Sequence, residues 1–190
     1  YESNCSKQNK SIFFDQVFYG SEMLIDRVDD VQGVTIADFN GDNHPDIYLT
    51  CYQTINHLLL NQGNGYFIDR VIESGAGGNI ETRGHKRKVE TGALAADFDR
   101  DGDVDLLLAG KRETTRLLVN NGKAVFHDKT AQSNLPSDLN ISDGALGDFN
   151  EDGYPDILLV DENKNLLIFL NNKYNRFCLQ NLGYLSLPST

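Results

Sequence analysis

The sequence has little cysteine and no long apolar segment. Its three cysteines, Cys5, Cys51 and Cys178, are widely spaced. No CxxC pair and no His/Cys cluster of zinc-binding spacing accompanies them. No apolar run approaches the roughly 20 residues that cross a bilayer, and no charged-then-apolar signal segment opens the chain. A disulfide framework, a zinc site and a membrane span are therefore not expected.

Two expectations follow for the cysteines and the first residue. Cys51 lies in an apolar, strand-like run, so we expect a buried thiol there, because cysteine is among the residues most often buried. A bridge between Cys5 and Cys178 is the alternative for the other two. The chain begins with Tyr1 rather than Met, which leads us to expect a processed mature chain or a fragment.

Basic residues are also scarce relative to acidic ones. The 190 residues include 17 Lys and Arg against 28 Asp and Glu, a formal charge of −11. A general role in gripping nucleic acid phosphates is therefore disfavoured. The hydrophobic share of 39% and charged share of 24% are typical of one ordinary globular domain. A cation is the partner that this charge most demands.

What the sequence does contain is a repeated acidic segment. It occurs at residues 37–47, 96–106 and 147–157, with first Asp residues 59 and 51 positions apart (97 − 38 and 148 − 97). Each copy is followed by apolar, strand-like runs and by an Asn-rich turn with a short strand, more loosely in the third copy. No sustained 3.6-residue apolar period with caps is present, so helices should be few.

Four short strands per repeat predict an all-β fold of β-propeller blades, each a four-stranded antiparallel sheet. About three blades are present, so we expect them to be part of a larger propeller, completed by a longer protein or by other copies. Residues 13–17 mirror residues 67–71 and are expected to be the outer strand of a preceding blade. The expected divisions are an N-terminal segment at 1–30, blades at 31–75, 92–133 and 134–181, a polar loop at 76–91 and a tail at 182–190.

Each acidic segment offers oxygen donors at alternate positions. Positions 1, 3, 5 and 9 are Asp, Asp or Asn, Asp, and Asp, and position 7 offers a backbone carbonyl. Such a set suits calcium, which takes six to eight oxygens at ~2.3–2.6 Å. An EF-hand would have Glu at position 12, where Leu49, Leu108 and Leu159 stand. Solvated turn residues are the other alternative, but clustered carboxylates in three copies need a counter-ion each time.

Turn geometry and charge rank the three loops. Gly102 and Gly153 occupy position 6, where a sharp turn favours positive φ, whereas the first loop has Asn43. The second loop supplies four carboxylates and the others three, so the second site should bind most tightly and the first most weakly. Phe residues at position 2 should point into the blade core. They are Phe39, Phe98 and Phe149.

The pattern ADF(D/N)xDGxxDL, followed by NxGxGxFxD, resembles FG-GAP or VCBS repeats. These occur in integrin α-subunit propellers and in secreted proteins, including the cartilage-acidic-protein-like group. The resemblance covers about residues 11–180 and implies a seven- or eight-bladed propeller, about three bound Ca2+ ions near one rim, and an extracellular, secreted or periplasmic location. The ligands it implies are Asp38, Asn40, Asp42, the His44 carbonyl and Asp46; Asp97, Asp99, Asp101, the Asp103 carbonyl and Asp105; and Asp148, Asn150, Asp152, the Tyr154 carbonyl and Asp156.

The expected function is a non-enzymatic, calcium-stabilised extracellular module that binds a protein, as in cell adhesion, or serves as a structural subunit. The alternatives are part of a propeller enzyme, such as a lyase or hydrolase, and a glycan-binding lectin. His57, His85 and His127 are expected in strands, turns or loops, since no nucleophile motif accompanies them. The expected partner is another protein or the remaining blades, and not nucleic acid. The basic run at residues 83–88 is either a solvated loop or a contact for an acidic partner or sulfated glycan.

Overall fold

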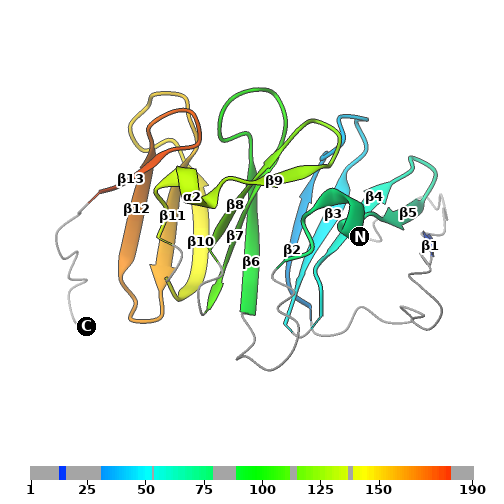
Figure 1. The fold of residues 1–190 in the computed structure, drawn as a ribbon, viewed down its shortest axis with the longest axis horizontal. Coiled ribbons are helices and arrows are strands. Elements are labelled where there is room, and N and C mark those ends of the chain that lie inside the picture. Colours follow the sequence, from blue (N-terminus) through cyan, green and yellow to red (C-terminus); the bar gives the residue numbers. More distant parts are fainter. Residues whose placement is uncertain are drawn as a thin grey trace, which may run out of the picture.

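The computed structural model describes residues 13–15, 31–52, 54–78, 89–111, 115–136 and 139–180. Within them the chain folds into three sheets that stand side by side in chain order (Figure 1). The predicted all-β architecture of propeller blades is confirmed. Among these residues, no helix has the length and apolar character needed to span a membrane.

Each blade is a four-stranded antiparallel meander. The first comprises β2 (Val31–Ala37), β3 (Asp46–Cys51), β4 (His57–Asn61) and β5 (Tyr66–Asp69). The second comprises β6 (Val89–Ala96), β7 (Asp105–Lys111), β8 (Arg116–Asn120) and β9 (Phe126–Asp128). The third comprises β10 (Ile141–Gly147), β11 (Asp156–Asp161), β12 (Leu166–Asn171) and β13 (Phe177–Gln180).

A short strand is added to the outer edge of the first blade. β1 (Phe13–Asp15) pairs with β5 in parallel, with Phe14 opposite Phe67. An outer strand has an unpaired edge of N–H and C=O groups, and β1 occupies that edge. That residues 13–17 belong to a preceding blade stays a prediction.

The helices of the described chain are two single turns. α1 (Val71–Ser74) follows β5, and α2 (Thr130–Ser133) follows β9. Each ends at a residue with positive φ, Gly75 at 75° and Asn134 at 61°, which is the usual left-handed helix end. The expectation of few helices is confirmed.

The hydrophobic core lies between blades. Because side chains alternate across a strand, β7 contributes to two clusters. Leu106 and Leu108 pack with blade 1 residues including Tyr48, while Leu107 packs with blade 3 residues including Phe169. Each sheet therefore needs a neighbour on both faces to bury its apolar residues.

Two of the three position 2 phenylalanines belong to these interfaces. Phe39 packs edge-on against Phe126 of the next blade at 5.9 Å, and Phe98 packs in the same way against Phe177 at 5.7 Å. Both are buried, as predicted, but Phe149 is 47% exposed and its prediction is wrong. The reason is that these rings are covered by the following blade, and the described residues contain no blade after the third.

Cysteine burial agrees in part with expectation. Cys51 is 4% exposed, which confirms its predicted burial. Cys178 is exposed on β13. Cys5 lies outside the described residues, as do His85 and the basic run at 83–88.

Candidate metal centre

The three acidic loops connect the first two strands of each blade. They join β2 to β3, β6 to β7 and β10 to β11, and all lie at the same edge of the stacked sheets, the upper edge in Figure 1. The repeat therefore places three chemically similar loops along one rim. Each loop is held by hydrogen bonds that recur at matching positions.

The ninth position carries a fully buried carboxylate in every loop. In the second loop, Asp105 Oδ2 accepts a hydrogen bond from the backbone N–H of Phe98 (3.1 Å), and Oδ1 accepts one from Asn120 (2.8 Å). Asp46 and Asp156 make the equivalent pairs of bonds. This carboxylate thus ties the loop to the third strand of its blade. Sequence reasoning expected a metal ligand here and missed this structural role.

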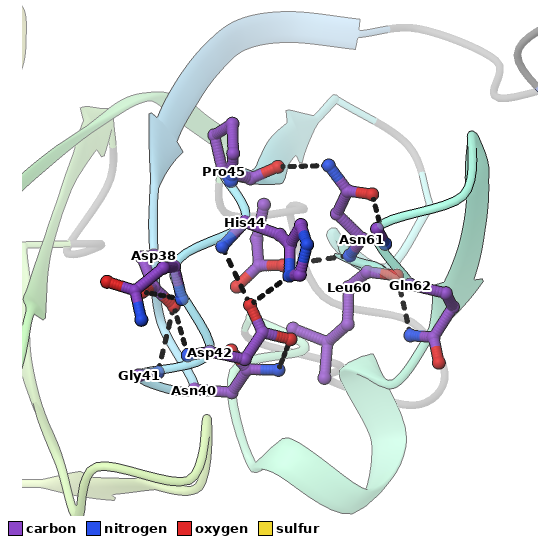
Figure 2. Close-up of polar contacts among 12 residues, drawn as sticks. Asp38, Asn40, Gly41, Asp42, His44, Pro45, Leu60, Asn61 and Gln62 are labelled. Carbon is purple, nitrogen blue, oxygen red and sulfur yellow. Dashed lines mark hydrogen bonds and ion pairs between the residues drawn. The ribbon is translucent and has the colours of Figure 1, made fainter. Parts of the chain in front are cut away.

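The carboxylate at the first position accepts hydrogen bonds from backbone N–H groups of the turn. Asp38 Oδ1 accepts from Gly41 (2.8 Å) and Asp42 (3.1 Å), and its Oδ2 accepts from Asn43 (2.7 Å) (Figure 2). Asp97 and Asp148 repeat the bonds to positions 5 and 6. The loops are consequently wound around their first carboxylate.

Each loop has two residues in the left-handed region. At position 6 the φ values are 66° for Asn43, 100° for Gly102 and 85° for Gly153, as the turn argument predicted. Position 4 is also left-handed, at Gly41, Arg100 and Glu151. Every loop therefore has one glycine across these two positions, and Asn43 does not set the first loop apart. The sequence signal was present, since Gly41 stands at position 4.

Position 3 distinguishes the second loop from the others. Asn40 and Asn150 donate their side-chain amides to Asp42 (2.9 Å) and Asp152 (3.2 Å) in their own loops. Asp99 instead accepts a 2.7 Å hydrogen bond from Asn175 Nδ2 in blade 3. The second loop is thus tied to the neighbouring blade through an acidic side chain.

The second loop also concentrates negative charge. Carboxylate oxygens of Asp97, Asp99 and Asp105 lie within 4.8 Å of one another. Burial raises the pKa of Asp105 to about 7, with Asp99 and Asp101 adding to the effect, although two backbone hydrogen bonds oppose it. Burial and the neighbouring Asp101 likewise raise the pKa of Asp99. These hard oxygen donors fit a cation such as calcium, which would offset their repulsion.

In the first loop, the carboxylate at position 5 is stabilised by hydrogen bonds. Burial acts to raise the pKa of Asp42, but hydrogen bonds from the His44 backbone, Asn40 and the His44 ring outweigh it, and the pKa is lowered. The His44 Nδ1 atom lies 3.1 Å from Asp42 Oδ1 (Figure 2). The predicted ligand roles of the His44, Asp103 and Tyr154 carbonyls stay predictions.

Other polar residues are built into the blades. His57 begins β4 and lies 2.5 Å from Asp69 Oδ2, with both side chains buried. Arg116 and Asp128 form the corresponding pair in blade 2, at 3.1 Å. Sequence reasoning expected His57 in a strand or a turn and missed both ion pairs, although the spacing of 12 residues recurs. His127 lies in β9.

A buried polar network joins the first two blades. Tyr48 donates its hydroxyl hydrogen to the Ala76 carbonyl (2.6 Å), and Asn56 Nδ2 contacts both the Tyr48 hydroxyl (2.8 Å) and Glu90. All three side chains are nearly inaccessible to solvent. Sequence reasoning missed this network because its members come from separate elements.

Comparison with known proteins bears on this pattern. Residues 97–159, which include the second and third loops, match the family model described as an FG-GAP-like repeat. The chain is also similar to cartilage acidic protein 1 from Mus musculus, with 31% identity over 100 residues. That alignment covers 51% of this chain and 14% of the mouse protein. Residues 97–159 are therefore similar to an FG-GAP-like repeat, which confirms the resemblance predicted from the loop and turn pattern.

Proposed function

We propose that this chain is a calcium-stabilised, non-catalytic propeller module that acts outside the cell by binding another protein or as a structural subunit. The observation that carries the proposal is the same oxygen-lined loop in three successive blades at one rim. Each loop presents acidic side chains. Its backbone turn donates hydrogen bonds to the carboxylate of the first Asp. A bound calcium ion would offset the repulsion between these carboxylates and so stabilise the loop.

The donor chemistry supports calcium in particular. The proposed ligands are all hard oxygen atoms, and the second loop brings three carboxylates within 4.8 Å of one another. Magnesium demands a stricter octahedral arrangement and keeps more of its water, whereas calcium accepts a larger and more flexible set of protein oxygens. Three bound ions would change the formal charge from −11 to −5.

The proposed non-catalytic and extracellular roles have separate support. His57 is held by Asp69 inside blade 1, with its side chain 5% exposed, so its ring is poorly placed for proton transfer to a substrate in solvent. The FG-GAP-like repeat supports an extracellular location and a protein partner, as the resemblance implies. Remaining blades of a larger propeller are the alternative partner.

Calorimetric titration with calcium tests the proposal. The parent chain should bind about three Ca2+ ions, since each loop offers one complete donor set. Asp97→Asn should remove the tightest binding phase. As a matched control, Asp161→Asn alters an acidic residue at the β11–β12 turn, outside the loops, and should leave the stoichiometry unchanged. Absence of calcium binding by the parent chain would rule out the proposal.

A further inference from the structure

The turn before β13 differs from those of the other blades in having no glycine at its left-handed positions and in a third left-handed residue, Tyr174. Lys173, Tyr174 and Asn175 have φ values of 63°, 55° and 60°, three successive non-glycine residues in the left-handed region. The first and third of these positions are Gly63 and Gly65 in blade 1. Left-handed geometry strains residues with a Cβ atom, and such strained residues cluster at functional sites.

Asn175 directs its side chain at the second acidic loop. The residue is 9% exposed, and its Nδ2 donates to Asp99 Oδ2 at 2.7 Å. Its Oδ1 is buried and has no hydrogen-bond partner among the residues that the structure describes. A buried amide oxygen without a partner is unfavourable. The Oδ1 atom of Asn175 is therefore available as a ligand.

The matching position in blade 2 shows that this location is built to face the preceding loop. Ala124 occupies it, with φ of 55°, and its backbone N–H donates to the Phe39 carbonyl beside the first loop (2.9 Å). Ala124 offers no side-chain donor atom. Asn175 therefore adds an amide where the equivalent turns have alanine or glycine, and it does so beside the most acidic loop.

We propose that Asn175 supplies a calcium ligand to the second loop from the neighbouring blade. This inference rests on the proposed calcium function. With carboxylates alone, the Nδ2 donor faces Asp99; with a cation among them, the amide oxygen is the favourable atom to face the site, and the two differ only by rotation of the amide group. Calcium takes six to eight oxygens, so five loop positions leave room for a further ligand.

A cavity adjoins this position. Asp99 and Asn175 line a cavity of about 540 Å³ between blades 2 and 3, together with Lys129, Tyr174 and Arg176. A predicted metal site requires an entry path, and a cavity beside the ligands is compatible with one. Because its ligands come from two blades, the second site would also link calcium binding to the blade 2–3 interface.

The test uses Asn175→Gly in a chain whose first and third loops are disabled by Asp38→Asn and Asp148→Asn. Glycine suits the left-handed backbone, so the melting temperature in chelator should be unchanged or higher than in the parent background. Calcium affinity, measured by calorimetry, should fall by about tenfold, as for loss of a supporting group at a metal site. Asn175→Asp retains a ligand oxygen and should bind calcium at least as tightly as the background chain.

Lys173→Gly is the backbone control. It relaxes the same turn, and its ammonium group lies 5.4 Å from the Tyr154 ring rather than at Asp99. Removing this positive charge should not weaken calcium binding. If the background chain binds calcium and Asn175→Gly leaves the affinity unchanged, the role of Asn175 is overturned while the calcium proposal stands. If the background chain binds no calcium, the proposed function of the second loop fails as well.

Discussion

At the residue scale, the carboxylates at positions 9 and 3 of the second loop are of two kinds. The ninth carboxylate is fully buried and accepts backbone N–H groups with both oxygens, as Asp105 does from Phe98 and Asn120. The carboxylate at the third position, that of Asp99, accepts hydrogen bonds from the Asp101 N–H and the Asn175 amide, and other carboxylates flank it. The ninth position therefore stabilises the fold directly, whether or not it also binds an ion.

This division predicts opposite effects of two similar substitutions in excess chelator. Asp105→Asn should lower the free energy of unfolding by about 1–3 kcal/mol, because the new amide N–H faces a backbone N–H. Asp99→Asn should leave it unchanged or higher, because one of the mutually repelling carboxylates loses its charge. Urea denaturation of both variants measures the difference. Equal destabilisation by the two would contradict the division.

At the element scale, one asparagine joins each pair of neighbouring blades. Asn120 Nδ2 donates to the Phe39 carbonyl of blade 1, and Asn171 Nδ2 donates to the Phe98 carbonyl of blade 2, at 2.8 and 2.7 Å. Each also contacts a carbonyl in its own loop. Asn61 occupies the same position in blade 1, and among the described residues its Nδ2 donates only within its own blade, to the Pro45 carbonyl (Figure 2).

Alanine substitutions at these positions should show how much the inter-blade hydrogen bond contributes to stability beyond the hydrogen bond within the blade. Asn171→Ala should lower the free energy of unfolding by about 1–3 kcal/mol, because the buried Phe98 carbonyl and the part-buried Pro155 carbonyl lose a donor. Asn120→Ala should cost less, because the Phe39 carbonyl keeps its hydrogen bond from the Ala124 N–H. Asn61→Ala is the matched control and should lose only about 0.5–1 kcal/mol, since its bond is exposed. Denaturant midpoints measure these losses, and equal values for Asn61 and Asn171 would rule out the inter-blade contribution.

The loop turns have a further consequence. Since each loop has one glycine across its two left-handed positions, the expectation that Asn43 makes the first site weakest loses its basis, and the ranking rests on charge alone. Glu151→Gly should raise stability by up to ~1 kcal/mol, and Asn43→Gly by less, because Asn tolerates this region better. Thermal unfolding in chelator compares the two variants. A larger gain from Asn43→Gly would contradict the argument.

At the scale of the whole molecule, local features were predictable from the sequence and inter-blade features were not. The loops and strands follow from residue spacing over short distances. The covering of Phe98 by Phe177, and the contact of Asn175 with Asp99, join positions more than 75 residues apart. The sequence predicted that the position 2 phenylalanines face inward, which holds for Phe39 and Phe98, but it did not show that the next blade would cover them.

The stack of sheets also explains where apolar surface remains. Val34 and Ile36 of β2 are 61% and 64% exposed, and Phe149 of the third loop is 47% exposed. Matching positions in blade 2, such as Ala93 and Ala95, pack against blade 1. Among the residues that the structure describes, the two end sheets thus lack the cover that the middle sheet has on both faces. A total of seven or eight blades stays a prediction.

The central claim is that calcium stabilises the blades, and thermal unfolding with and without calcium tests it most directly. With site affinities of ~0.1–1 mM, calcium at ~1 mM contributes about 0.4–1.4 kcal/mol per site. Three sites should raise the melting temperature by roughly 3–15 °C over that in excess chelator, and magnesium at the same concentration should raise it less. Superimposable melting curves in calcium and in chelator would contradict the account.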